Sequence, residues 1–174
     1  MTEIEMLKEM LSMQEEYDQM VFDTHGMKDS YNSVSGDDLY LALFDELGEL
    51  IHEMKARWCW WKNTQKPEDR KKVLEELVDV VHFVLMTVLR LEKRRTVDED
   101  PVKEFLNGFA YECEQERKVT LAEAVYCTSF ANDSFLHGQA LVYLHNACGF
   151  TWQEVYEAYK KKNAVNRKRV KDGY

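Results

Sequence analysis

Proline and glycine are scarce in this chain, which has two prolines and seven glycines among its 174 residues. Both residues interrupt regular helices, so their scarcity favours long helices joined by short connections. Runs of alternating apolar and polar residues, which indicate half-buried strands, are also nearly absent. The composition therefore predicts an all-α protein, a helical bundle of about five to six helices that forms one domain over residues 1–174.

Three further absences exclude classes of function. The formal net charge of −9 argues against general binding of nucleic acids, because their phosphates need a basic surface. The four cysteines have no CxxC spacing, which favours reduced thiols and a cytoplasmic location. No signal peptide and no run long enough to span a bilayer is visible, so we expect no membrane association.

Two pairs of carboxylates dominate residues 41–84. Glu46 and Glu49 form the first pair, and Glu76 and Asp79 form the second. A spacing of three residues places each pair on one face of a helix. The turn between the two segments predicts a central antiparallel hairpin that brings the four carboxylates level with one another. Because an excess of oxygen ligands favours Mg²⁺ or Mn²⁺, the sequence predicts a metal site here.

The second pair lies in an unusual setting. Residues 77–89 are apolar around nearly the whole circumference of the expected helix, a pattern typical of burial on all sides. Asp79 and His82 interrupt this pattern. An isolated buried carboxylate is unfavourable by several kcal/mol, so Asp79 should be paired or metal-bound. The alternative that all four acids are solvated surface charges explains Glu46 and Glu49 but not Asp79.

The ExxE and ExxD motifs together resemble the signature of the all-α NTP pyrophosphatases, the MazG-like superfamily. More narrowly, five motifs in order along the chain resemble the dimeric all-α dUTPase family. These are Gln14-x-x-x-Asp18, Glu46-Leu-Gly-Glu49-Leu50, Trp60-Trp61-Lys62, Glu75-Glu76-Leu-Val-Asp79-Val-Val-His82-Phe83 and Tyr159-x-x-Lys162-Asn163-x-x-Asn166-x-x-Arg169-x-x-x-Gly173-Tyr174. The resemblance implies a homodimeric, Mg²⁺-dependent hydrolase that converts dUTP to dUMP and pyrophosphate and so limits the incorporation of uracil into DNA. It names dUDP as a second candidate substrate.

The resemblance also implies roles for individual residues. Glu46, Glu49, Glu76 and Asp79 would bind the metal, and Glu49 would orient or deprotonate the attacking water. The residues expected to bind substrate are Gln14, Asp18, Trp61, Lys62, His82, Lys162, Asn166, Arg169 and Tyr174. Within this set, Gln14 would contact the uracil or the sugar, and the pyrimidine would stack on Trp61.

The spacing of the basic tail supports a phosphate site independently. Lys162, Asn166 and Arg169 fall at i, i+4 and i+7, one stripe of a helix. They would present an ammonium, an amide and a guanidinium toward phosphate oxygens. A solvated basic face is the alternative interpretation.

Helix boundaries follow from caps and breakers. The expected helices cover residues 3–22, 37–60, 67–94, 101–117, 120–149 and 151 onward, and capping-box patterns open the last two at Thr120 and Thr151. Residues 23–36 are rich in Ser, Asn and Gly and form either a lid or an idle surface loop.

Three other functions stay open at this stage. A dCTP or broad NTP pyrophosphatase would keep the fold and chemistry and change the base. A di-iron carboxylate bundle is possible because Glu49-x-x-His52 and Asp79-x-x-His82 each resemble half of its Glu-x-x-His pairs. A structural dimerisation module of helices is the third, although it does not explain Asp79.

Overall fold

The computed structural model describes residues 1–28, 30–115 and 117–173. Within them the chain is all-helical, which confirms the predicted fold class, with eight α-helices and one short 3-10 helix and without strands. The elements are α1 (Glu3–Thr24), η1 (Ser30–Ser33), α2 (Gly36–Glu53), α3 (Lys55–Trp58), α4 (Arg70–Arg94), α5 (Pro101–Gln115), α6 (Leu121–Phe130), α7 (Ser134–Cys148) and α8 (Trp152–Lys171).

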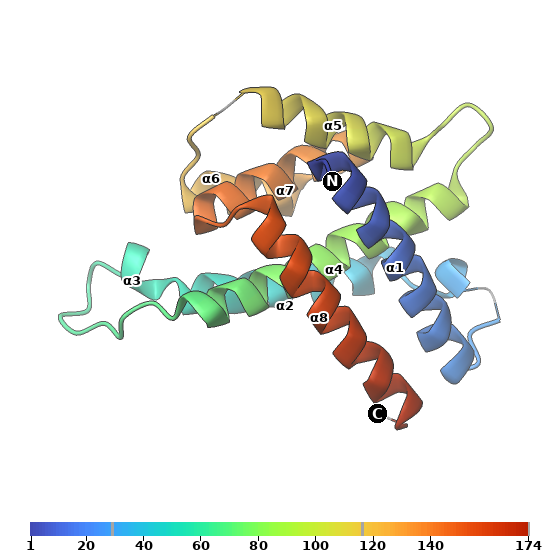
Figure 1. The fold of residues 1–174 in the computed structure, drawn as a ribbon, viewed down its shortest axis with the longest axis horizontal. Helices are drawn as coiled ribbons and strands as arrows, with labels where there is room; N and C mark the ends of the chain where they lie inside the picture. Colours follow the sequence, from blue (N-terminus) through green and yellow to red (C-terminus); the bar gives the residue numbers. More distant parts are fainter. Residues whose placement is uncertain (29, 116, 174) are drawn as a thin grey trace.

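Helix α4 runs through the middle of the molecule and contacts helices on several sides. It pairs with α2 in the expected antiparallel hairpin, and α1 and α8 lie side by side across it (Figure 1). Helices α5, α6 and α7 pack together as a second group, which contacts α4 through both α5 and α7. Ten residues of α4 are buried, spread from Val73 to Leu89. This agrees with the apolar pattern that predicted a helix buried on all sides.

The two helices of the predicted hairpin are shorter than expected. Helix α4 begins at Arg70 rather than at Pro67, since the Asp69 carboxylate accepts hydrogen bonds from the N–H groups of Lys71 and Lys72 at 3.0 and 3.4 Å. Helix α2 ends at Glu53, and the separate single turn α3 carries the chain to Trp58.

The single helix predicted for residues 120–149 is wrong. The chain leaves the helical conformation after Phe130 and restarts at Ser134, where the Asp133 carboxylate accepts from the N–H of Leu136 at 2.8 Å. The polar run Asn132-Asp133-Ser134 was the available sequence signal for this break. The predicted capping boxes at Thr120 and Thr151 are confirmed. The break after Phe130 and the separate turn α3 explain why the described residues form eight α-helices where about five to six were predicted.

No helix among the described residues is both long enough and apolar enough to cross a membrane.

Helices α5 and α7 approach so closely that glycine is required on both. A Cβ atom added at Gly108 would lie 2.0 Å from the backbone oxygen of Phe135, and one added at Gly138 would lie 2.2 Å from that of Phe105. Because the obstructing atoms belong to the backbone, no side-chain rotation can relieve the clash. The two helices would have to separate.

We predict that Gly108→Ala destabilises the protein by about 1–3 kcal/mol, the usual effect of overpacking a core. Gly48→Ala is the matched control, because a Cβ there meets nothing within 4 Å on the exposed side of α2. Its free energy of unfolding should rise by about 0.5–1 kcal/mol, because alanine reduces the entropy of the unfolded chain. Urea unfolding measures both. Equal stability of the two variants would contradict the close approach of α5 and α7.

Candidate active site

Three carboxylates meet where α2 packs against α4. Glu46 and Glu49 come from α2 and Glu76 comes from α4, and one carboxylate oxygen of each lies within 4.8 Å of the other two. The buried leucines of α2 face the core beside them. The glutamates therefore line the edge of the core and converge on one point, as the spacing of three predicted. We call Glu46, Glu49 and Glu76 the acid cluster.

Asp79, the fourth carboxylate of the predicted set, lies outside the acid cluster and is paired with a lysine. The Lys162 ammonium of α8 donates to its Oδ2 at 2.6 Å, and the Asp79 side chain is 18% exposed. The sequence indicated that Asp79 needs a counter-charge or a metal. The structure supplies a cation from a helix 83 residues further along the chain.

Glu46, Glu76 and Asp79 have raised pKa values at this site. Burial, followed by the charges of Asp79 and Glu49, raises the pKa of Glu46 to about 7. Burial and the Glu49 charge also raise the pKa of Glu76. The pKa of Asp79 is raised by burial despite the opposing effect of Lys162. The site therefore concentrates more negative charge than Lys162 offsets, and a cation would stabilise it.

A chain of buried hydrogen bonds joins α1, α4 and α8 next to these acids. Gln14 lies at its centre and is 2% exposed. The Gln14 oxygen Oε1 accepts from His82 Nδ1 and from the Tyr159 hydroxyl, each at 2.7 Å, while its Nε2 donates to Asp18 Oδ1 at 2.7 Å. The Tyr31 hydroxyl donates to the other oxygen of Asp18 at 2.8 Å. We call these five residues the polar network.

His82 presents an unprotonated nitrogen in this network. Since Gln14 Oε1 can only accept, Nδ1 carries the ring proton and Nε2 is a bare acceptor. Burial lowers the pKa of His82 to about 3, so the ring is neutral. Stacking on Tyr159, with ring centroids 4.3 Å apart, holds the ring in place. Nε2 is buried and has no hydrogen-bond partner among the described residues, which is unusual for a buried polar atom.

A cavity of about 440 Å³ opens beside the polar network, between α1, α4 and α8. This volume falls in the range of small-molecule sites. Residues of the polar network line it together with Glu46, Asp79, Lys162, Asn166 and Arg169. The cavity thus has neutral polar groups at one part of its wall and charged groups of both signs at another, which suits a ligand with an uncharged ring and an anionic tail.

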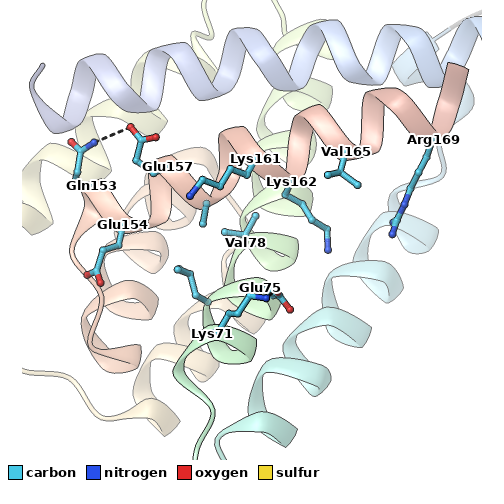
Figure 2. Close-up of a pocket in the computed structure, with 12 residues that line it drawn as sticks. Lys71, Glu75, Val78, Gln153, Glu154, Glu157, Lys161, Lys162, Val165 and Arg169 are labelled. Atoms are coloured by element: carbon cyan, nitrogen blue, oxygen red, sulfur yellow. Dashed lines mark hydrogen bonds and ion pairs between the residues drawn. The ribbon is translucent and has the colours of Figure 1, made fainter.

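A second hollow of about 690 Å³ lies between α4 and α8 and shares Lys162 and Arg169 with the cavity (Figure 2). Its floor is apolar, with Val78 from α4 and Val165 from α8, and lysines stand at its edge. In Figure 2 Lys162 extends from α8 into the space beside α4, and Arg169 extends from the last turns of α8 toward α2. The two basic side chains therefore stand between the two hollows.

Not every predicted residue comes to this site. Trp61 and Lys62 lie in the segment after α3, at the end of the molecule far from the last turns of α8 (Figure 1), and neither lines the cavity. Trp61 is 57% exposed and contacts Trp58 and Trp60. Tyr174 lies outside the described residues.

The histidines of the di-iron alternative point elsewhere. His52 contacts Lys55, with the lysine Nζ 2.7 Å from its Nδ1, and His82 is held by Gln14. Neither joins the acid cluster among the described residues. The geometry therefore offers no support for a di-iron carboxylate centre.

Sequence reasoning missed Tyr31, the residue that ties the 25–35 segment to the site. Tyr31 is 4% exposed, packs edge-on against Phe22 with centroids 5.0 Å apart, and binds Asp18. A tyrosine among serines and asparagines carries no periodic signal of burial. The segment is therefore anchored to the polar network by a buried side chain, which neither the lid nor the idle-loop interpretation foresaw.

The pH dependence of folding offers a test of the buried Asp18. Burial raises the pKa of Asp18 to about 7, against about 3.9 in an unfolded chain. Between these values the folded protein retains a proton that the unfolded chain releases. The contribution of Asp18 to stability is therefore full below pH 4 and declines as the pH rises to 7.

We predict that Asp18→Asn, which cannot ionise, gains roughly 4 kcal/mol relative to the wild type between pH 4 and pH 8. Urea unfolding of both proteins at several pH values measures this gain. Glu46 titrates in the same range but is present in both proteins, so its effect cancels in the difference. A stability difference independent of pH would show that the pKa of Asp18 is not raised by folding.

Comparison with known protein families gives one match, to the family described as dUTPase, over residues 6–174. This range includes every residue that the sequence proposed for the site. No curated protein matches the chain.

Proposed function

Because the chain belongs to the dUTPase family, and is thus a hydrolase that acts on dUTP, we propose that the acid cluster and the adjacent cavity form its active site. The observation that carries this proposal is the convergence of three carboxylates from two helices beside a cavity with a basic wall. The base and sugar would occupy the cavity. The triphosphate would extend from it toward the acid cluster, Lys162 and Arg169.

The donor atoms of the acid cluster suit Mg²⁺, with Mn²⁺ as the alternative ion. All of them are carboxylate oxygens, the ligands that both ions favour. In this proposal Glu46, Glu49 and Glu76 hold the ion and Asp79 completes the acidic wall. When bound, the ion would offset phosphate charge and polarise a phosphoryl oxygen. The raised pKa of Glu46 supports the proposal, because its causes, burial and then the neighbouring negative charges, are conditions that a bound cation would relieve.

Glu49 is the candidate for activating water. It is the most exposed member of the acid cluster, so a water molecule can reach its carboxylate. In our proposal Glu49 orients this water and accepts its proton as the oxygen attacks phosphorus. The products are dUMP and pyrophosphate. The same contacts would serve dUDP, because its base and sugar are identical.

The tail helix α8 would neutralise the phosphates. Lys162 and Arg169 line the cavity from α8, and Asn166 lies between them on the same stripe. Charge-assisted hydrogen bonds from such groups are roughly twice as strong as neutral ones. Lys162 already binds Asp79. Its ammonium has three N–H donors, so it could donate to the anionic substrate while it stays bound to Asp79.

The polar network supports uracil as the base. Uracil presents two carbonyl acceptors with the N3–H donor between them. Gln14 Nε2 uses one N–H on Asp18, so its second N–H can donate to a carbonyl of the base. His82 Nε2, the unpaired acceptor, can accept from N3–H. Cytosine has an acceptor at N3 and a donor at N4, so the same groups would oppose it. This favours dUTP over the dCTP alternative.

We also propose that the protein forms a homodimer through an exposed aromatic face. This face consists of Tyr40, Leu41 and Phe44 on α2 and Tyr126 and Phe130 on α6, which a hydrogen bond from the Tyr40 hydroxyl to the Ser129 carbonyl holds together. Grouped exposed aromatics of this kind are typical of protein interfaces. Trp61 and Lys62, distant from the cavity of their own chain, would then be available to a partner.

Metal binding and activity should disappear together in one variant and persist in its control. We predict that Glu49→Gln weakens Mn²⁺ binding in isothermal titration at least about tenfold and lowers kcat for dUTP by about 10²-fold or more. Glu75→Gln, one position before Glu76 on the exposed face of α4, should change neither. If Glu49→Gln binds Mn²⁺ and hydrolyses dUTP as the wild type does, the acid cluster is not the metal site.

Charging the aromatic face should dissociate the dimer. Phe130 is 64% exposed, so Phe130→Glu should alter the stability of the single chain by only about 0.5 kcal/mol. We predict that it converts a dimer to a monomer in size-exclusion chromatography with light scattering. Val97→Glu, at a fully exposed position outside the aromatic face, should remain dimeric. A wild-type monomer, or a dimeric Phe130→Glu protein, would contradict the proposed interface.

A further inference from the structure

The donors and acceptors of the polar network are arranged in one fixed order, and a single residue, Asp18, determines this order. Asp18 accepts hydrogen bonds at both carboxylate oxygens, one from Tyr31 and one from Gln14. As an ionised carboxylate it has no proton to donate. The Gln14 amide must therefore turn its Nε2 toward Asp18 and its Oε1 toward α4 and α8.

This orientation passes on to His82. Because Gln14 Oε1 faces the ring, the ring proton resides on Nδ1, and Nε2 remains an acceptor. Both side chains line the cavity, so in the proposed complex a base would meet an N–H of Gln14 and the bare nitrogen of His82. If the Gln14 amide were flipped, its carbonyl would face the base, and the His82 ring proton would reside on Nε2. Gln14 would then offer an acceptor and His82 an N–H donor. A site with that reversed pattern would match N4 and N3 of cytosine.

We propose that Asp18 selects uracil over cytosine as a positioning residue, by fixing the hydrogen-bond direction of Gln14 and His82. Tyr31 holds the Asp18 carboxylate by its second oxygen. The proposal rests on the binding of the base in this cavity, as inferred above. It revises the expectation from the family resemblance that Asp18 contacts substrate directly, because both of its oxygens are already occupied within the protein.

Asp18→Asn should reverse the network. A phenol hydroxyl is a better donor than acceptor, so Tyr31 should still donate and hold the amide oxygen of the new side chain on its own side. The amide N–H groups would then face Gln14 and favour its flipped orientation. Tyr31 therefore does not set the direction of the network while Asp18 is ionised, whereas in Asp18→Asn it favours the cytosine pattern.

The decisive measurement is the ratio of kcat/KM for dUTP to that for dCTP, at pH 8.5 where Asp18, with a pKa of about 7, is ionised. We predict that Asp18→Asn lowers this ratio at least about tenfold. Tyr31→Phe alone should retain the wild-type ratio, because the carboxylate still cannot donate. Tyr31→Phe added to Asp18→Asn should restore at least part of the ratio, since the amide is then free to turn its oxygen toward Gln14.

Tyr143→Phe is the matched control. Tyr143 lies on α7, in the second group of helices, and its hydroxyl accepts a hydrogen bond from Arg117. Like Tyr31→Phe, this substitution removes one partly buried hydroxyl. Added to Asp18→Asn, it should leave the lowered ratio unchanged. A general loss of packing would affect both double variants alike. Rescue by Tyr31→Phe alone therefore identifies a directed hydrogen bond.

The tautomer of His82 gives a readout that does not depend on activity. At pH 8.5, where Asp18 is ionised, ¹⁵N NMR of labelled histidine should show the proton on Nδ1 in the wild type and a shift toward Nε2 in Asp18→Asn. Finding the wild-type proton on Nε2 would overturn the proposal even if Asp18→Asn failed to fold. So would a folded Asp18→Asn enzyme with the wild-type ratio. Equal use of dUTP and dCTP by the wild type would instead overturn the assignment of the base cavity.

Discussion

The burial of polar groups on α4 is the constraint on which the rest of the structure depends. Asp79 and His82 lie in residues 77–89 of α4, a stretch that is otherwise mostly apolar and has no exposed residue, and each would be strongly unfavourable without a partner. Helix α8 supplies Lys162 to Asp79, and α1 supplies Gln14 to His82. The crossing of α1 and α8 over α4 is therefore fixed by hydrogen bonds as well as by apolar contact. The same contacts form the walls of the cavity.

The site combines stabilising and destabilising parts. The polar network satisfies most of its members internally, which makes it rigid. The acid cluster does the opposite, because burial and neighbouring negative charges together raise the pKa values of Glu46 and Glu76. Local conflict of this kind is common where a ligand supplies the missing charge. The groups proposed to recognise the base are therefore rigid in the protein alone, whereas the groups proposed to bind metal are stabilised only when a cation binds.

The sequence predicted much of this arrangement because its strongest patterns are periodic. The spacing of Glu46, Glu49 and Glu76, and the apolar pattern around Asp79, placed the hairpin and the acid cluster correctly. Features that depend on single contacts between distant segments were not predictable. Neither the pairing of Asp79 with Lys162 nor the burial of Tyr31 has a periodic signal. The break after Phe130 was missed because its cap, Asp133, lies within an otherwise helical pattern.

The contact between α1 and α8 has a consequence for the order of folding. Tyr159 donates to Gln14 across 145 residues of sequence, whereas the α2–α4 hairpin and the α5–α7 group join neighbouring segments. Contacts between distant segments carry a larger loop-closure entropy and tend to form late. The acid cluster can therefore assemble early, while the base cavity exists only after the two ends of the fold have met. Nucleotide binding would report that the last step of folding is complete.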